Sequence, residues 1–364
     1  MNAPVRLAEH TTSRVGGPAA DWIDARSASE AVQALRALDA SGVPVLVLGG
    51  GSNTLMADAG FPGTVVRLAF SGVELVEESG STVRVRMAAG QDWDEAVAFT
   101  VGQGLTGLEA LSGIPGSAGA TPVQNVGAYG ADVSHTLTSV QAWDRAAGDL
   151  VTLTAAELDF GYRDSVIKRS LNASDDTTPR WVVLGVDFTL HRSGSTAPVR
   201  FAQLAHALGV DEGEAAPLET VRHHVLHLRA GKGMVLDPED HDTWSTGSFF
   251  TNPIVPASVR ARLPADAPAY GAGRDEDGND LVKLSAAWLI DRAGFSKGFG
   301  LGPDEHGIAG ARASLSTKHT LAVTNRGSAR TADLLAVART VRDGVEARWG
   351  VRLHPEPVLV GCTL

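Results

Sequence analysis

Glycine is distributed unevenly along this chain, and its clusters restrict the fold more than any other feature. The sequence has 41 glycines among 364 residues, concentrated at 49–51, 102–130 and 294–310. Because glycine has no Cβ atom, such clusters occur where a backbone turns tightly or approaches another group closely. We therefore expect loops of defined conformation that lie against a partner.

Short apolar runs alternate with helical patterns between these clusters. In the first helical pattern, 28–40, Val32, Leu35 and Leu38 share one face behind a Ser29 cap. Further helices are predicted at 92–101, 201–209, 218–230, 281–293 and 331–348. Strands are predicted at 43–48, 64–68, 73–76, 82–87, 139–143, 150–153, 181–190 and 319–324. The mixture predicts an α+β protein, with loops at 172–180 and 191–198 and a domain boundary near 190–200.

Composition excludes several classes of protein. The sequence has 31 Lys+Arg against 42 Asp+Glu, which gives a net charge of −11. Because a nucleic-acid-binding protein needs a basic face, a general nucleic-acid-binding function is not expected. The single cysteine, Cys362, excludes a disulfide framework, a Cys-rich zinc site and an iron–sulfur cluster. His223 and His227 share a helical face but lack the Glu and third ligand of a zinc site, so no metal is expected.

The chain start and its apolar runs favour a cytoplasmic protein. Residues 1–10 have no apolar core of signal-peptide length. No apolar run approaches the ~20 residues that cross a bilayer.

Two glycine-rich segments are candidates for ligand contact. Gly49-Gly50-Gly51-Ser52-Asn53 follows a strand-like run, and its N–H groups are suited to an anion such as phosphate. The alternative is a tight turn. Segment 112–130 holds five glycines and two prolines with almost no charge, which indicates an apolar partner such as a heterocycle, whose edge the Gln124 and Asn125 amides could bind. Its alternative is a buried loop packed on itself.

Three further residues have settings that suit catalysis. Arg163, beside a tyrosine, is able to clamp a carboxylate, although an ion pair with Asp164 is the alternative. Ser248 stands between a glycine and two phenylalanines. Its hydroxyl is a candidate for catalysis in this apolar setting, and the alternative is that it caps a helix or a turn. Glu356 lies between two prolines, which hold it in an extended conformation.

Taken together, these segments resemble the bacterial UDP-N-acetylenolpyruvoylglucosamine reductase family of flavoenzymes. The resemblance includes His10–Gly17, Gly49–Asn53, Gly116–Gly130 and Gly161–Ser165, then Gly247–Pro253, Trp288–Asp291 and Pro355-Glu356. Their order and spacing make the resemblance specific.

The resemblance implies a fold with two domains. An FAD-binding domain of the vanillyl-alcohol-oxidase (PCMH) type is expected over 1–195, with two α/β subdomains at about 1–72 and 73–195. A C-terminal α/β substrate-binding domain is expected over 196–364, and its final strand, 357–362, is expected to pack back on the N-terminal domain.

The resemblance also implies cofactors and the residues that hold them. FAD is the expected bound cofactor, and NADPH the hydride-donating co-substrate. The expected FAD-binding residues are Arg14, Gly49, Gly50, Gly51, Ser52, Asn53, Ile114, Gly116, Ser117, Gly119, Ala120, Gln124, Asn125, Gly127 and Tyr129.

The implied reaction reduces UDP-N-acetylglucosamine enolpyruvate to UDP-N-acetylmuramate for peptidoglycan synthesis. The expected catalytic residues are Arg163, Ser248 and Glu356, with Ser248 as proton donor. The expected substrate contacts are Tyr129, Tyr162, Arg163, Lys232, Ser248, Asn252, Tyr270, Lys297, His319 and Glu356. Phe201 and Thr251 depart from the tyrosine and lysine of many relatives. We expect a monomer that binds this small molecule and neither nucleic acid nor membrane.

Two other functions remain possible from the residues alone. A flavin-linked oxidase or dehydrogenase of the same fold would share the glycine-rich segments but would not need Ser248 and Glu356. A sugar-nucleotide-binding regulator without activity would be expected to lose at least one of the three catalytic residues, whereas all three are present.

Overall fold

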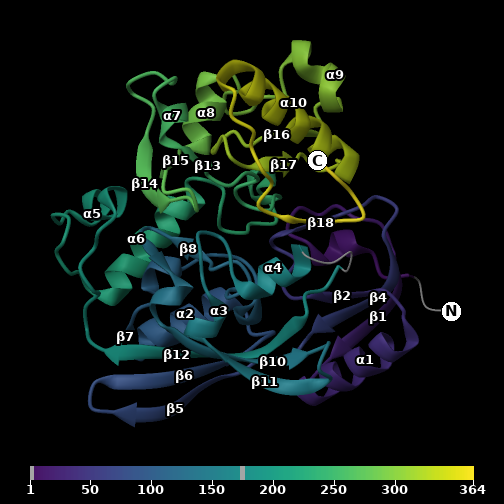
Figure 1. Cartoon of the computed structure of the whole chain (residues 1–364), viewed down its shortest axis with the longest axis vertical. Helices are drawn as coiled ribbons and strands as arrows, with labels where there is room; N and C mark the ends of the chain where they lie inside the picture. The colour runs from purple at the N-terminus through teal and green to yellow at the C-terminus, as the bar shows by residue number, and fades with distance from the viewer. Residues whose placement is uncertain (1–3, 173–176) are drawn as a thin grey trace. The chain divides into compact units, whose positions relative to one another are not determined.

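The computed structural model describes residues 4–172 and 177–364 (Figure 1), so part of the expected 172–180 loop and the first three residues of the chain lie outside it. The chain divides into two compact units. Unit 1 comprises residues up to 5, 19–51 and 61–235, and unit 2 comprises Arg6–Pro18, Ser52–Gly60 and Leu236–Leu364. This division differs from the expected boundary at 195/196. Residues 196–235 belong to unit 1, and two early segments belong to unit 2.

A small parallel sheet begins unit 1. Its strand order is β1 (Ala19–Ala25), β4 (Phe61–Leu68) and β2 (Val45–Leu48). Helix α1 (Ala28–Ser41) buries Leu35 completely. Its cap is Ser27, whose hydroxyl accepts the Glu30 N–H at 3.1 Å, and not the expected Ser29.

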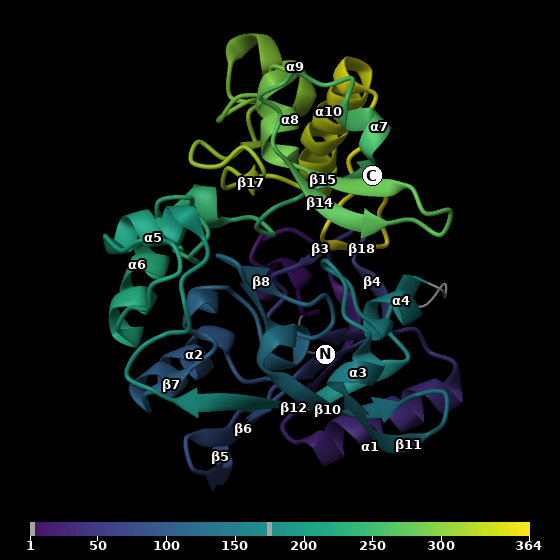
Figure 2. The ribbon, with the colours of Figure 1, turned by 60° about the vertical axis from the view of Figure 1, so that its left-hand side comes forward.

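A larger antiparallel sheet forms the rest of the core of unit 1. Its order is β11 (Asp149–Thr154), β10 (Leu137–Asp144), β12 (Trp181–Arg192), β6 (Thr82–Ala88) and β5 (Val73–Ser79), with β7 (Leu105–Thr106) also paired to β12. Along β6 every second side chain is buried, as the strand period of two requires. Figures 1 and 2 show α2 (Trp93–Gly102) and α3 (Ala155–Leu158) on one face of this sheet. Trp93 of α2 packs against Phe188 of β12 with ring centroids 5.8 Å apart.

Short elements and three helices complete the described part of unit 1. The glycine-rich segment contains η2 (Glu109–Leu111), η3 (Ala118–Ala120), β8 (Gly127–Ala128), β9 (Ala131–Asp132) and η4 (Val133–His135), and α4 (Val166–Asn172) follows later. Helices α5 (Ala202–Leu208) and α6 (Leu218–Ala230) share a small core of Leu204, Val221 and Val225.

Unit 2 is built around helix α10 (Thr331–Trp349), whose Val337 and Val341 are fully buried. Its sheets are β13 (Ile254–Pro256), β15 (Asp280–Leu284) and β14 (Ala269–Arg274), then β16 (Ala313–Leu315) with β17 (Val323–Asn325), and β18 (Val358–Val360) with β3 (Thr54–Met56). Its other helices are α7 (Ala257–Arg260), α8 (Ala286–Arg292), α9 (His306–Ala309), η1 (Leu7–His10), η5 (His241–Thr243) and η6 (Pro303–Glu305).

Two of the predicted elements in unit 2 are wrong. The helix expected over 281–293 is strand β15 followed by α8, and Ser285, which caps α8, separates them. The strand expected over 319–324 begins only at Val323, because residues before it turn. The expected final strand is present as β18, and its partner β3 is an early segment that belongs to unit 2.

Mixed helices and strands confirm the α+β class. None of the described helices has the length and apolar character needed to cross a bilayer.

Candidate active site

In unit 1, the loop after β2 lies directly against the glycine-rich segment. A Cβ atom on Gly50 would lie 2.7 Å from the Cα atom of Gly116, and one on Gly49 would lie 2.3 Å from Ser117 Oγ. Gly119 is equally constrained, since its Cβ would lie 2.5 Å from that of Ala89. These glycines are therefore required by contact between two protein segments, as in the alternatives of a tight turn and a packed loop. The ligand contact expected at the same glycines remains a prediction.

The same loop retains the features of an anion site. Gly51 has a left-handed φ of 59°. Within the described residues, the N–H groups of Gly50 and Gly51 donate no hydrogen bond. Unused N–H groups at a left-handed turn suit a phosphate oxygen, so these residues fit the diphosphate of FAD. The expected loop 49–53 crosses the unit boundary, with Ser52 and Asn53 in unit 2.

Backbone strain coincides with the predicted site residues. Six described non-glycine residues have positive φ, namely Arg14, Asn125, Tyr129, Asp159, Arg163 and Ala311. Four of these, Arg14, Asn125, Tyr129 and Arg163, belong to the predicted site. Left-handed conformations cost free energy in non-glycine residues and are concentrated at functional sites. The roles of these four residues remain predictions.

Side chains of unit 1 hold this strained backbone. The Asn125 amide donates to the Gly161 carbonyl at 3.1 Å and accepts the Ser134 N–H at 3.2 Å, so it stabilises the loop. Arg163 donates to the carbonyls of Asn125 at 3.2 Å and Gly127 at 2.6 Å. Asp164 instead forms its ion pair with Arg169. Arg163 is thus fixed to the glycine-rich segment.

Tyr129 and Lys232 lie close together in unit 1. Lys232 Nζ is 5.7 Å from the centre of the Tyr129 ring and donates to Gln203 Oε1 at 2.8 Å. Phe201 meets the same ring edge-on, with centroids 5.5 Å apart. Burial raises the pKa of Tyr129. Burial, together with the charge of Arg229, lowers the pKa of Lys232. The arrangement suits an anionic group beside Lys232.

Arg229 is a candidate that sequence reasoning missed. Its residue is only 8% exposed, and burial lowers the pKa of its guanidinium to about 10. A signal was present in the sequence, because Val221, Val225 and Arg229 recur every four residues on the buried face of α6. A charged residue on an apolar stripe is a candidate for a functional role.

In unit 2, the segment that follows Ser248 pairs with the segment that carries Glu356. The Glu356 N–H donates to the Phe249 carbonyl at 2.9 Å, and Phe250 forms an antiparallel bridge with Pro355. Both phenylalanines are buried, at 0% and 1% exposure, and so anchor the segment. Within the described residues, the Ser248 hydroxyl makes no hydrogen bond, which leaves it available to a substrate.

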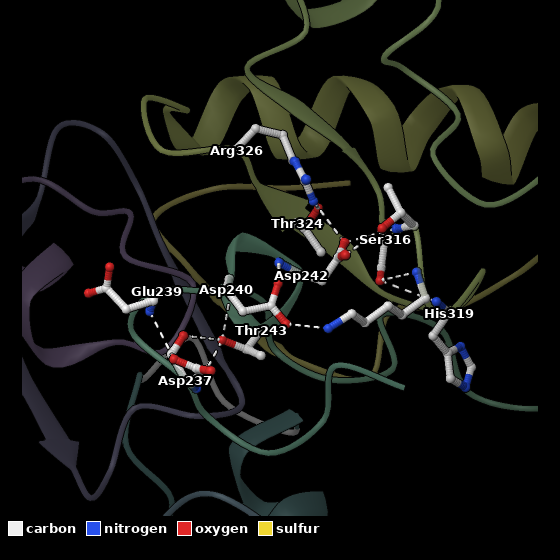
Figure 3. Close-up of polar contacts among 11 residues, drawn as sticks. Asp237, Glu239, Asp240, Asp242, Thr243, Ser316, His319, Thr324 and Arg326 are labelled. Carbon is white, nitrogen blue, oxygen red and sulfur yellow. Dashed lines mark hydrogen bonds and ion pairs between the residues drawn. The ribbon is translucent and has the colours of Figure 1, made fainter. Parts of the chain in front are cut away.

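His319 is joined to this segment through Leu321. The Leu321 N–H donates to His319 Nδ1 at 3.0 Å, and the Leu321 carbonyl accepts the Phe249 N–H at 2.8 Å. An Nδ1 acceptor places the proton of the neutral ring on Nε2. Figure 3 shows the ring directed away from the carboxylates of Asp240 and Asp242.

A network of charged side chains around the buried Asp242 supports the loop that carries His319. Asp242 accepts the Thr317 N–H at 2.8 Å and pairs with Arg326 at 2.7 Å, while Asp240 pairs with Lys318 at 2.6 Å (Figure 3). Although burial opposes it, hydrogen bonds from Thr317 and the charge of Arg326 hold the pKa of Asp242 below its usual value. The network fixes the 316–319 turn.

The other predicted residues of unit 2 are more scattered. Arg14 lies over the Trp244 ring at 3.9 Å. Asn252 Oδ1 accepts the Ala286 N–H at 2.9 Å, at the start of α8. Tyr270 and Lys297 are exposed, and their side chains make no hydrogen bond within the described chain. No group of three or more His, Cys, Asp or Glu among the described residues is placed to hold a metal.

Comparison with known proteins identifies first the class and then the family. Residues 22–154 match the model of an FAD-binding domain, and residues 237–360 match that of the UDP-N-acetylenolpyruvoylglucosamine reductase C-terminal domain. The chain therefore carries the FAD-binding domain of a flavoprotein, as expected, and FAD is its cofactor.

Named relatives resolve the family. The chain is 56% identical to UDP-N-acetylenolpyruvoylglucosamine reductase of Nocardia farcinica, over 99% of this chain and 90% of the relative. It is 51% identical to that of Salinispora arenicola, over 100% and 96%. The crystal structure of the Thermus caldophilus reductase has the same fold, with a TM-score of 0.62, 24% identity and 98% coverage of both chains. The chain belongs to the UDP-N-acetylenolpyruvoylglucosamine reductase family.

Proposed function

We propose that this chain reduces UDP-N-acetylglucosamine enolpyruvate to UDP-N-acetylmuramate with NADPH, in the cytoplasmic synthesis of peptidoglycan precursors. The family membership, with full-length relatives of that name at 50–56% identity, carries the assignment. The backbone pairing of the two residues after Ser248 with Pro355 and Glu356 supports it. We further propose that the chain acts as a monomer, which light scattering on the purified protein would test.

We propose Arg163, Ser248 and Glu356 as the catalytic residues. Bound FAD supplies the hydride transfer from NADPH to the enolpyruvyl carbon. The hydroxyl of Ser248, unengaged within the described residues, donates a proton to the neighbouring carbon. Arg163 stabilises the negative charge of the enolpyruvyl carboxylate, which Glu356 orients. Serine is a weak acid, but the acceptor is a carbanion equivalent, so the basicity of the acceptor drives the transfer.

The binding residues take complementary roles. Gly50 and Gly51 offer N–H groups to the FAD diphosphate, and the segment from Ile114 to Tyr129 lines the isoalloxazine ring. Lys232 and Tyr129 contact the diphosphate of the sugar nucleotide. A lysine with a lowered pKa beside a half-buried tyrosine suits an anion that enters from water.

Separate half-reactions test the proposal. The purified holoprotein is titrated without oxygen, first with NADPH and then with the enolpyruvyl nucleotide, while flavin absorbance is followed. We expect bleaching by NADPH and full recovery by the nucleotide. Because one flavin serves both substrates in turn, initial-rate plots should be parallel.

The same titration separates the alternatives. A flavin oxidase would recover its absorbance with oxygen but not with the nucleotide. A regulator without activity would show no bleaching. Intersecting initial-rate lines would contradict the alternating use of one site.

A further inference from the structure

The turn that contains Thr12 lies against the segment that leads to Ser248, and both belong to unit 2. The Thr12 hydroxyl donates to the Ser245 carbonyl at 2.6 Å, and the Ser52 carbonyl lies 3.4 Å from the same hydroxyl oxygen. Because a hydroxyl has only one proton to donate, the shorter contact, to Ser245, is the hydrogen bond. It joins two residues that are 233 positions apart in the chain.

The short turn between Ser245 and Ser248 has its own hydrogen bond. The Gly247 N–H donates to Ser245 Oγ at 3.1 Å, so the Ser245 side chain closes the turn. Gly247 has a φ of 74°, and a Cβ atom there would meet nothing within 4 Å, so close packing at Gly247 does not hold the turn. After Ser248, the Phe249 N–H donates to the Leu321 carbonyl at 2.8 Å. The Ser248 backbone is therefore held through Phe249 on one side and through Ser245 on the other.

The turn that carries Thr12 is itself fixed by Asn325 of β17. The Asn325 side-chain amide donates to the carbonyls of Ser13 at 3.1 Å and Arg14 at 3.3 Å. The Asn325 backbone N–H donates to the Trp244 carbonyl at 2.9 Å. Asn325 is buried, so one residue binds both the turn of Thr12 and the start of the segment that leads to Ser248. The Thr12 hydroxyl thus projects from a fixed base.

We propose that Thr12 is a positioning residue for the proton transfer from Ser248, and the inference rests on the proposed function. In that step the Ser248 O–H bond breaks, its proton bonds to the substrate carbon, and a proton from water restores the hydroxyl. Within the described residues the Ser248 hydroxyl has no hydrogen bond to direct it, so its direction depends on the backbone that Thr12 fixes at Ser245. A displacement of about 1 Å at a reacting group slows a reaction about 100-fold.

Hydrogen exchange of the holoenzyme tests the positioning directly. Thr12→Val replaces the hydroxyl with a methyl group of similar size. We expect the amides of Gly247 and Phe249 to exchange about fivefold faster, as for loss of one hydrogen bond. Thr11→Val is the matched control, because Thr11 and Thr12 are both 7% exposed and the Thr11 hydroxyl donates to the Val15 carbonyl of its own turn at 3.1 Å. Thr11→Val should leave both exchange rates unchanged.

The two half-reactions test the consequence for catalysis. In Thr12→Val we expect bleaching by NADPH at nearly the native rate and reoxidation by the enolpyruvyl nucleotide slowed about 10- to 100-fold. Thr12→Ser keeps the hydroxyl and should restore most of the reoxidation rate, whereas Thr11→Val should leave both half-reactions nearly native. In a Ser248→Ala background, Thr12→Val should slow reoxidation no further, because the residue through which Thr12 acts is absent. Thr12→Ala replaces Thr12→Val if that variant does not fold.

Four results would overturn the proposal. They are equal slowing of both half-reactions in Thr12→Val, unchanged exchange at Gly247 and Phe249, further slowing in the Ser248→Ala background, and loss of FAD with native reoxidation in the fraction that retains it. The last result would assign the Thr12 hydroxyl to the Ser52 carbonyl instead.

These results are separable from the proposed function. A native enzyme that reduces the nucleotide, with native reoxidation in Thr12→Val, contradicts only the role of Thr12. A native holoenzyme that is not reoxidised by the nucleotide contradicts the proposed function, and hydrogen exchange still tests whether Thr12 holds the segment before Ser248.

Discussion

The two units hold their proposed catalytic residues in different ways. In unit 1, Arg163 has a left-handed φ of 54°, and its guanidinium is bonded to two loop carbonyls. In unit 2, Ser248 and Glu356 lie on segments joined by backbone pairing between buried phenylalanines and a proline-flanked partner. Unit 1 therefore depends on unusual backbone conformations and close glycine contacts. Unit 2 depends on backbone pairing between two extended segments.

Ser248 gives the strongest test of this difference. Ser248→Ala removes one oxygen that is unbonded within the described residues, while Phe249 and Phe250 stay buried. We expect flavin bleaching by NADPH at nearly the native rate, because that step needs no proton from Ser248. Reoxidation by the enolpyruvyl nucleotide should slow about 10²–10⁴-fold, as for loss of a positioned general acid. Stopped-flow absorbance measures each half-reaction separately.

Cysteine at the same position is the matched control. Ser248→Cys keeps a proton donor and should restore part of the reoxidation rate. If both half-reactions slow equally in Ser248→Ala, the residue shapes the site, and its role as proton donor has to be withdrawn.

Gly50 tests the dependence of unit 1 on backbone contact. In Gly50→Ala, the new Cβ atom would meet the backbone of Gly116 at 2.7 Å, so the two loops must separate. We expect loss of most bound FAD on purification and a cost of about 1–3 kcal/mol in the free energy of unfolding, as for overpacking. Flavin absorbance per protein and urea denaturation measure the two effects.

Gly102→Ala is the control in the same unit. A Cβ atom there meets nothing within 4 Å, so FAD occupancy should be native and stability equal or slightly higher. Full flavin occupancy in Gly50→Ala would contradict the role of the loop in holding FAD, and an unchanged free energy of unfolding would contradict its role in packing.

Much of the fold and site could be predicted because the signals are local. Helix α6 spans the predicted 218–230, and the glycine clusters indicated tight loops. The resemblance predicted Ser248 and Glu356 as catalytic residues, and Glu356 is joined by a backbone hydrogen bond to Phe249, the residue after Ser248. Their chemical roles remain predictions.

What sequence reasoning missed depends on contacts between distant segments. The parallel pairing of β18 with β3 joins residues about 300 positions apart, and this pairing assigns an early segment to unit 2. Position 50 needs a glycine because the backbone of Gly116 lies against it. The spacing of residues in the sequence does not reveal this contact. Residues 281–293 have an apolar pattern that suits a helix, but the first four residues pair with β13 and β14 instead.

The smallest expected effect compares one buried aspartate from each unit. Asp144 accepts from Arg180 at 2.7 Å, from Trp181 Nε1 at 3.1 Å and from two backbone N–H groups of the turn after β10. These hydrogen bonds, chiefly that of Arg180, lower the pKa of Asp144 to about 2. In unit 2, Asp242 has a similar environment with Thr317 and Arg326.

The sign of the pH dependence follows from the lowered pKa. The native state favours the ionised form of Asp144. The contribution of the Asp144 carboxylate to the free energy of unfolding is therefore complete above the unfolded pKa of about 3.9, and it is lost as pH falls through about 2. Because Arg180 is 47% exposed, water screens the pair, and we expect Asp144→Asn to cost about 1 kcal/mol at pH 7. The difference between native and variant Tm should shrink as pH is lowered from about 5 towards 2.

Hydrogen exchange at pH 7 should place the loss of protection in β10–β12 for Asp144→Asn and in unit 2 for Asp242→Asn. A difference in Tm that stays constant with pH would mean that hydrogen-bond geometry, and not the charge, is what Asp144 contributes.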